Sequence, residues 1–271
     1  MYKYYCVFLL VCALAFAEEA GKGTCPESNA KQIEYYSKDL PLVILDYNDL
    51  VNRANLQALV ATAYGQEGLG ILLVRNVPGL KEKREELLKL ARSLAYLTDE
   101  QKQEIEHPQS LYSVGWSHGK EKLAKDQPDF SKGSFYANPL TDDPTNGNRE
   151  WISQYPSFYH PNLWPVNSLP QLQSAFMETG QLVHEIGKLI AYQMDQLVSS
   201  VRPQYVKGTL VDVVGTNLPK GRLLYYFSSD EMKKFNLGNT PHGTSSSTSQ
   251  GSSREDNWCG WHNDHSSLTG L

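Results

Sequence analysis

The C-terminal segment Trp258–Leu271 (WCGWHNDHSSLTGL) constrains the fold more than any other stretch of the chain. If this segment is a β-strand, the side chains of His262 and Asp264 point to the same face, because strand residues alternate with a period of two. An imidazole and a carboxylate placed in this way can occupy two adjacent coordination positions of one metal ion. Pairs of this kind also occur by chance, so the rest of the sequence decides what the pair means.

The overall composition is that of an ordinary globular protein. Of the 271 residues, 40% are hydrophobic and 20% are charged, which is enough apolar material for one large domain or two small ones. The net charge is −5 and the isoelectric point is near 5.8. We expect no nucleic-acid partner, because the binding of phosphates requires a basic surface. The oligomeric state is not readable from the sequence.

Residues 1–17 are predicted to be a secretory signal peptide. Lys3 gives the segment the positively charged N-terminal region of a signal peptide, and residues 6–16 are apolar. Ala15–Ala17 (AFA) matches the small-residue pattern of a cleavage site. The apolar run is too short to cross a bilayer, which takes about 20 residues. We therefore expect the secretory pathway or the extracellular space as the location, with no membrane contact after cleavage. An uncleaved anchor is the alternative.

Cleavage would leave Cys25 and Cys259 as the cysteines of the mature chain. Two cysteines do not make a disulfide framework, although they can pair in an oxidising compartment. Cys259 stands three residues before His262, so on a regular strand it faces away from the metal pair. We expect it to be a packing residue or half of a disulfide.

The stretch after the signal peptide predicts alternating strands and helices. Apolar runs at residues 41–45 and 71–74 predict two short strands. A helix is expected after Asp49, with Leu56, Leu59, Val60 and Ala63 on its apolar face, and another over residues 80–97. Thr98–Gln101 matches a capping box that opens a short polar helix. This order is typical of a small α/β layer.

The remaining chain predicts a cap, a long helix and a β-core. Residues 109–170 are rich in Gly, Pro and aromatic side chains and predict an irregular cap. A long helix is expected from Leu169 towards Val198, and Arg222–Phe227 (RLLYYF) predicts a core strand. Residues 240–257 are rich in Ser and lack aliphatic side chains, which predicts a solvated insertion.

Three other histidines lack the spacing of a ligand pair. For His118 we expect a structural hydrogen bond to the backbone rather than a metal. His184 lies on the long helix, at a position that suits either the core or the surface. His242 could replace a metal ligand only from within the Ser-rich insertion, where no orienting partner is visible.

The segment WHNDHSSLTGL resembles the H-x-D-x-x-x-L-T-x-L strand of the Fe(II)/2-oxoglutarate-dependent dioxygenases of the plant-type, isopenicillin N synthase-like family. Other segments are similar to the N-terminal region of that family in the same order: GWSHGKE at 115–121, GSFY at 133–136 and PNLWP at 161–165. The resemblance covers most of residues 40–271.

This resemblance implies the cofactors and their residues. His262 and Asp264 would bind Fe(II), and Tyr226 would hydrogen-bond the carboxylate of the co-substrate 2-oxoglutarate. The alternative for Tyr226 is a position in a core strand. The chain departs from the family at Leu224, where Asn is common, and at Phe227, where Pro is common. The family's third metal ligand, a His, and its Arg-x-Ser both come after the point that corresponds to Leu271.

We therefore predict an α+β fold in which an α/β region and a long helix precede the opening strands of a double-stranded β-helix, or jelly roll, incomplete at the C-terminus. The expected divisions are the signal peptide at 1–17, the dioxygenase N-terminal region at 18–167, and the long helix with the start of the jelly roll at 168–271. An incomplete jelly roll would expose strand edges and an apolar face.

Three functions remain open. The first is an oxygenase that oxidises a small organic substrate and decarboxylates 2-oxoglutarate, with its catalytic domain cut short in this chain and no catalytic side chain assigned. The second is a secreted pseudo-enzyme or binding module that keeps the fold without the chemistry. The third is an unrelated metal site, such as Zn²⁺ held by His262 and Asp264.

Overall fold

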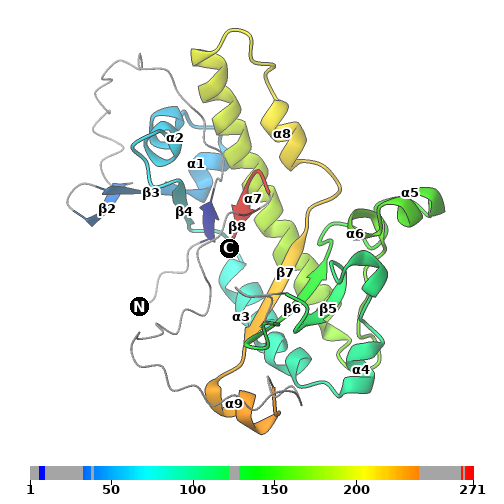
Figure 1. Ribbon diagram of the computed structural model, residues 1–271. Helices are drawn as coiled ribbons and strands as arrows, with labels where there is room; N and C mark the ends of the chain where they lie inside the picture. The colour runs from blue at the N-terminus through cyan, green and yellow to red at the C-terminus, as the bar shows by residue number, and fades with distance from the viewer. Residues whose placement is uncertain (1–5, 10–32, 38–39, 122–127, 238–263, 265) are drawn as a thin grey trace, which may run out of the picture. The chain divides into compact units, whose positions relative to one another are not determined.

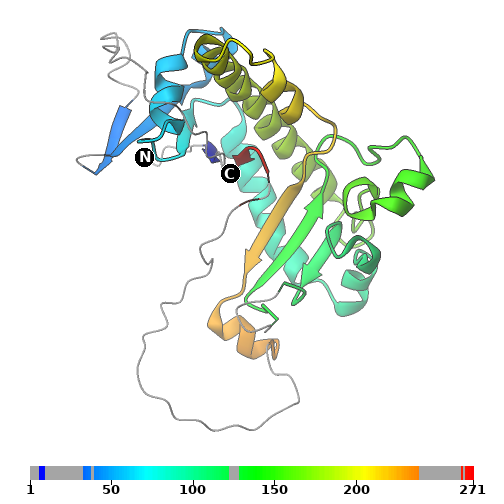
Figure 2. The same ribbon diagram turned by 45° about the horizontal axis from the view of Figure 1, so that its top comes forward.

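The computed structural model describes residues 6–9, 33–37, 40–121, 128–237, 264 and 266–271. The chain forms two compact units. The first unit comprises Met1–Glu85, Phe176–Pro219 and Asn263–Leu271, and the second comprises Glu86–Ala175 and Lys220–His262. Figure 1 and Figure 2 show the elements of both units in two views.

A five-stranded sheet in the order β2-β3-β4-β1-β8 organises the first unit. Its strands are β1 (Cys6–Leu9), β2 (Ile33–Ser37), β3 (Leu40–Asp46), β4 (Ile71–Arg75) and β8 (Thr269–Gly270). Strands β3 and β4 run parallel, and the other neighbours are antiparallel. Parallel neighbours need a crossover connection, which contains α1 (Tyr47–Val51) and α2 (Gln57–Tyr64). The two strands predicted at 41–45 and 71–74 are confirmed.

The single helix predicted after Asp49 is wrong, because two short helices occupy this stretch. Asp46 caps the first one, since its carboxylate accepts a hydrogen bond of 3.1 Å from the backbone N–H of Asn48. Arg53 has a φ of 54°, which a continuous right-handed helix does not allow. Helix α1 therefore ends before Arg53, and α2 begins as a separate helix. The predicted apolar face is buried: Leu56, Leu59, Val60 and Ala63.

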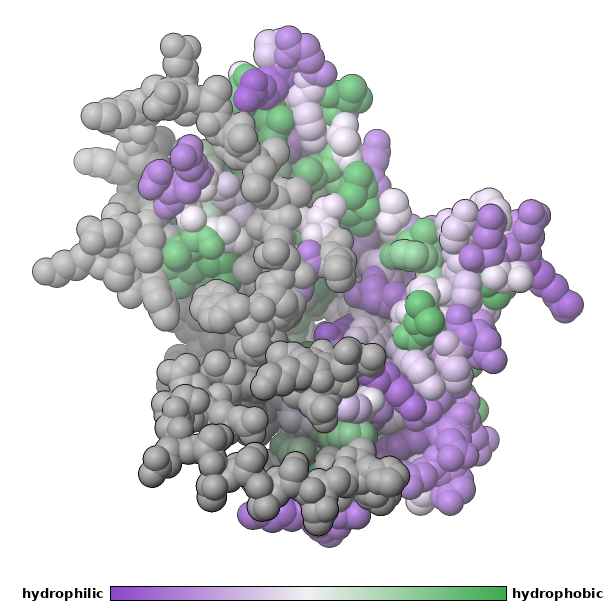
Figure 3. All heavy atoms as spheres, in the orientation of Figure 1, coloured by the Kyte–Doolittle hydropathy of each residue, from purple (hydrophilic) through white to green (hydrophobic). Residues whose placement is uncertain are grey.

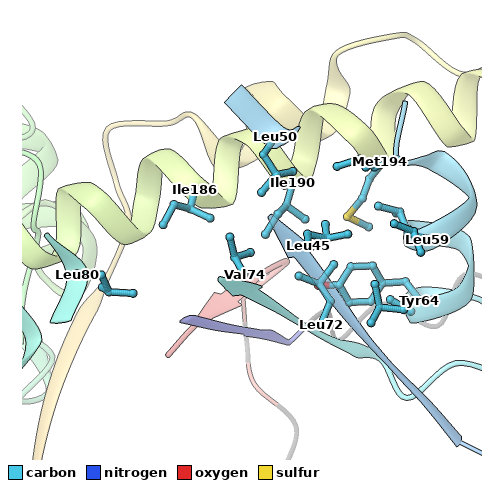
Figure 4. Packing of buried hydrophobic residues seen from close by; sticks show 14 residues of the cluster. Leu45, Leu50, Leu59, Tyr64, Leu72, Val74, Leu80, Ile186, Ile190 and Met194 are labelled. Carbon is cyan, nitrogen blue, oxygen red and sulfur yellow. The ribbon is translucent and has the colours of Figure 1, made fainter. Parts of the chain in front are cut away.

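Helix α7 (Gln171–Val201) carries one side of the core of the first unit. Its residues Ile186, Ile190 and Met194 repeat every four positions, so they form one stripe along the helix. In Figure 4 this stripe points toward Leu45 of β3 and Val74 of β4. All five side chains are at most 2% exposed. The long helix predicted from Leu169 is therefore confirmed.

A buried carboxylate of α7 holds the start of helix α8 (Thr209–Val214). Asp195 is 1% exposed, and its two oxygens accept hydrogen bonds of 3.0 Å from the backbone N–H groups of Leu210 and Val211. The hydroxyl of Tyr205 also donates to it. N–H groups in a first helical turn have no partner within the helix, and the residue before α8, Gly208, has no side chain to cap them. Asp195 takes over this role from a distant position.

We predict that Asp195→Ala lowers the free energy of unfolding by about 2–3 kcal/mol, because it leaves two partly buried N–H donors of α8 without acceptors. Urea unfolding followed by circular dichroism measures the effect. Asp212→Ala on the exposed side of α8 is the matched control and should change the stability by less than about 0.5 kcal/mol. Equal losses in the two variants would contradict the capping role of Asp195.

The second unit contains a three-stranded antiparallel sheet in the order β5-β6-β7. Its strands are β5 (Gly115–His118), β6 (Lys132–Ala137) and β7 (Gly221–Tyr226). The helices with residues in this unit are α3 (Leu80–Ala95), α4 (Asp99–Gln103), α5 (Arg149–Gln154), α6 (Pro156–Tyr159), the first turn of α7, α9 (Ser229–Lys234) and the 3-10 helix η2 (Pro108–Ser110). The predicted helix at 80–97, the capping box of Thr98 and Gln101, and the strand at 222–227 are confirmed.

The irregular cap predicted over residues 109–170 is wrong, because this stretch includes β5, β6, α5 and α6. Strand β6 pairs along its whole length with β7, which starts at Gly221. Its register depends on residues more than eighty positions away, and local composition does not report such a partner. The many Gly and Pro residues of this stretch were interpreted as a sign of irregular structure. They instead interrupt a series of short helices and strands.

Some expectations fall on residues that the structure does not describe. The pairing of Cys25 with Cys259, the role of His242 and the Ser-rich insertion at 240–257 lie outside the described residues. Of the predicted signal peptide, residues 6–9 are described, as strand β1. No helix in the described ranges is long and apolar enough to cross a membrane.

In the space-filling view, hydrophobic side chains gather in the area of α8 (Figure 3), where Val206 and Val213 are exposed.

Candidate functional site

The predicted site residues fall in different parts of the structure. Asp264 belongs to the first unit and Tyr226 to the second, whereas His262 lies outside the described residues. In the ranges that are described, no three His, Cys, Asp or Glu side chains come close enough together to hold a metal ion.

Asp264 is half-buried and is oriented by a neighbour in sequence. Its Oδ2 accepts a hydrogen bond of 2.8 Å from the hydroxyl of Thr269, and the hydroxyl of Ser266 lies 2.8 Å from that of Thr269. Leu268 packs against the hydrophobic core of the first unit. A carboxylate that is held in this way has a restricted set of orientations, which is what a metal ligand requires.

The strand predicted across the C-terminal segment is shorter than expected. Among the described residues of this segment, only Thr269 and Gly270 are in a strand, and Asp264 lies in irregular backbone. A side-chain hydrogen bond between residues five apart closes a turn, because an extended strand would carry Thr269 about 17 Å away from Asp264. Local hydrogen bonding therefore prevails over the strand pattern here.

Tyr226 lies on a face of the β5-β6-β7 sheet that carries polar side chains. Strand alternation puts Arg222, Leu224 and Tyr226 on one face, and the register sets them opposite Tyr136, Ser134 and Lys132 respectively. Tyr226 is half-buried at the end of β7, directly opposite Lys132. Leu224 places an apolar side chain in the middle of this face.

A charged cluster occupies this polar face, which we call the Glu121 cluster: Glu121, Asp129, Lys132, Ser134, Tyr136 and Arg222. The carboxylate of Glu121 accepts hydrogen bonds from Lys132 (2.9 Å), Tyr136 (3.0 Å) and Arg222. The guanidinium of Arg222 also donates to Ser134 Oγ, at 2.8 Å from one nitrogen and 3.2 Å from another. We did not predict this cluster, although the alternating polar residues of β6 are visible in the sequence.

The pKa values in the Glu121 cluster reflect burial and pairing. Burial alone would raise the pKa of the Glu121 carboxyl, but hydrogen bonding to Lys132 and the charge of Arg222 lower it on balance. Burial would lower the pKa of the Lys132 ammonium, whereas its bond to Glu121 raises it on balance. Burial raises the pKa of Tyr136 to about 12. Glu121 and Lys132 are thus both charged at neutral pH, and Tyr136 keeps its proton.

The opposite face of the same sheet is apolar. Trp116, Phe135, Leu223 and Phe227 are each at most 5% exposed. Phe227 therefore fills part of the core of the second unit.

Two histidines, His118 and His184, bind backbone carbonyl groups. This role was predicted for His118. The Nε2 of His118 lies 3.1 Å from the carbonyl oxygen of Phe130, which confirms the expected backbone hydrogen bond. Burial lowers the pKa of His118 and favours its neutral form. The Nε2 of His184 lies 2.7 Å from the carbonyl oxygen of Val214, so the largely buried ring ties α7 to the residue that ends α8.

The glycine of the GSFY segment allows Trp116 to lie across β6. A Cβ at Gly133 would come within 2.2 Å of the outer ring of the Trp116 indole.

We predict that Gly133→Ala lowers the stability by about 1–3 kcal/mol, because the core is already filled. In a Trp116→Phe background the same change should cost less, since phenylalanine lacks that outer ring. Thermal or urea unfolding of the four proteins gives the coupling energy, and additive losses would contradict the steric explanation.

No protein-family model matches this chain, and no curated protein matches it. It is similar to the crystal structure of a full-length Neurospora crassa protein in complex with alpha-KG, with a TM-score of 0.50 and 18% sequence identity. The match covers 78% of this chain and 62% of that chain.

Two further structures of the same Neurospora protein match less closely. The complex with alpha-KG and 5-formyluracil has a TM-score of 0.47 and 18% identity, covering 76% of this chain and 59% of that one. The complex with alpha-KG and thymine has a TM-score of 0.45 and 19% identity, covering 76% and 62%. The likeness to the first structure shows that this chain shares the fold of the Neurospora protein over much of its length. This chain spans about three fifths of the length of that protein.

Proposed function

We propose that this protein is a 2-oxoglutarate-dependent Fe(II) oxygenase of the isopenicillin N synthase-like family, which oxidises a small organic substrate. The observation that carries the proposal is the H-x-D-x-x-x-L-T segment, in which the Thr269 hydroxyl orients the Asp264 carboxylate. The fold shared with the Neurospora protein, which was crystallised with alpha-KG, agrees with the proposal. We propose that the sheet of the second unit belongs to the jelly roll of that family.

The residues of the C-terminal segment suit an iron ion. One imidazole and one carboxylate are two of the three donors in the facial triads that bind non-haem Fe(II). Asp264 also has the hydrogen-bonded partner that metal-binding carboxylates usually have. In this proposal His262 and Asp264 hold the metal, and Thr269 orients Asp264. The bound iron and 2-oxoglutarate would supply the oxidising chemistry.

Tyr226 is proposed to hydrogen-bond 2-oxoglutarate. Its place at the end of β7, on the polar face of the sheet, supports this role, because its hydroxyl can donate to a carboxylate. Leu224 contributes no such donor. In this proposal the co-substrate therefore lacks one hydrogen bond that family members with Asn at this position can provide. We also propose that residues 1–17 direct the protein to the secretory pathway.

We predict that His262→Ala and Asp264→Ala each abolish stoichiometric Fe(II) binding, because two of the protein's metal donors lie at these positions. The measurement is anaerobic Fe(II) titration of the protein in its complete encoded form, followed by metal analysis. Thr269→Val should keep the fold and weaken Fe(II) binding about 10- to 100-fold, as for other partners of metal ligands. The control Asp212→Ala removes an exposed carboxylate of the same unit and should bind Fe(II) as the wild type does.

The other functions give different results in the same experiment. Full Fe(II) binding by Asp264→Ala would refute the metal assignment. Preferential retention of Zn²⁺ over Fe(II) would favour the unrelated metal site. If iron binds but 2-oxoglutarate is not converted to succinate with any small substrate tested, the protein is a binding module with the family's fold. Succinate release that depends on both His262 and Asp264 would support the oxygenase.

A further inference from the structure

The Glu121 cluster has the composition of a binding site for a carboxylate. Three donors of different kinds converge on one carboxylate group: the Lys132 ammonium, the Tyr136 hydroxyl and the Arg222 guanidinium. Charge-assisted hydrogen bonds of this type are the strong ones that proteins use to recognise organic acids. The group that they hold in this structure is the side chain of Glu121.

We propose that Lys132, Tyr136 and Arg222 form a binding site for the carboxylate of a small organic acid, and that the side chain of Glu121 occupies this site when the acid is absent. The chain thus carries an internal competitor for its own ligand. This inference does not depend on the proposed oxygenase activity, because its test uses propionate and requires neither iron nor 2-oxoglutarate.

The three donors are held by the sheet. Tyr136 and Arg222 are direct partners in the register of β6 and β7, and Lys132 lies on the same face of β6. Ser134, between them on that face, accepts two hydrogen bonds from the guanidinium of Arg222 and fixes its plane. Donors on paired strands keep their positions when the occupant changes, which is the property of a preorganised site.

The occupant comes from a connection between strands. Glu121 follows β5 by three residues, and its side chain is 38% exposed. The side chain of Arg222 is 33% exposed, so solutes can reach both partners of this ion pair. Exposed ion pairs contribute little to stability. Replacing the carboxylate beside Arg222 by another carboxylate therefore costs the fold little.

The charges of the cluster balance only while Glu121 is in place. Lys132 and Arg222 contribute two positive charges, and Glu121 and Asp129 contribute two negative ones. Asp129 is 4% exposed and is fixed by hydrogen bonds from the backbone and hydroxyl of Ser131. Removal of the Glu121 charge leaves a net charge of +1 in the cluster and three donors without a charged acceptor, so the cluster attracts an external carboxylate.

The test compares propionate binding to the wild type and to Glu121→Gln. Propionate is the chemical equivalent of the end of a glutamate side chain, and propionamide is its uncharged analogue. Both are titrated at low ionic strength into protein with a chelator present, and the binding is followed by NMR. We expect Glu121→Gln to bind propionate about tenfold more tightly or better, because it no longer has an internal competitor with charge-assisted hydrogen bonds. Propionamide should show no gain.

Two variants separate the cluster from general charge effects. Glu185→Gln removes one negative charge from an exposed pair with Lys188 on α7 and should leave propionate binding unchanged. Glu121→Gln combined with Arg222→Gln should lose the gained affinity. If Glu121→Gln fails to fold by circular dichroism, Glu121→Asp replaces it, since its shorter side chain reaches the donors less well and should give a smaller gain.

The proposal is overturned if propionate binds equally to the wild type and to Glu121→Gln. It is also overturned if Glu185→Gln shows the same gain, or if the gain survives the loss of Arg222. In any of these cases the Glu121 cluster is an ion-pair network that serves the structure alone.

Discussion

The packing of helix α7 against the parallel strands β3 and β4 is the interaction on which the first unit depends. The stripe of Ile186, Ile190 and Met194 buries the face of these strands, and burial of each such side chain contributes about 1.5–3 kcal/mol. The same helix supplies Asp195, which caps α8, and His184, which reaches the carbonyl of Val214. Leu268 joins this core from the C-terminal segment, so the position of Asp264 rests on it as well.

In the second unit the two faces of one short sheet have separate tasks. The apolar face, with Trp116 and Phe135, holds the unit together and requires a glycine at position 133. The opposite face carries Tyr226 and the donors around Glu121, whose bonds to one another are partly open to solvent. Because side chains alternate along a strand, one register puts the apolar residues on the buried face and the candidate binding residues on the opposite face.

Local signals in the sequence predicted the elements with strong patterns. The capping box of Thr98 and Gln101, the strand at 71–74 and the helix from Leu169 onward all have a periodicity or a capping residue within the element itself. The break at Arg53 and the strands β5 and β6 escaped prediction. Arg53 has a positive φ that its residue type does not announce, and β6 owes its register to β7, more than eighty residues further along.

The sequence by itself determined which residues are proposed for metal and co-substrate, because H-x-D-x-x-x-L-T and the RLLYYF strand are readable as patterns. Only the tertiary structure decided that Thr269 orients Asp264 through a turn rather than a strand. It alone brought Glu121, Lys132 and Arg222 together, although Arg222 is about a hundred residues from Glu121. The physical reason is that a side chain's chemistry is local, whereas its partners are chosen by the pairing of strands that lie far apart along the chain.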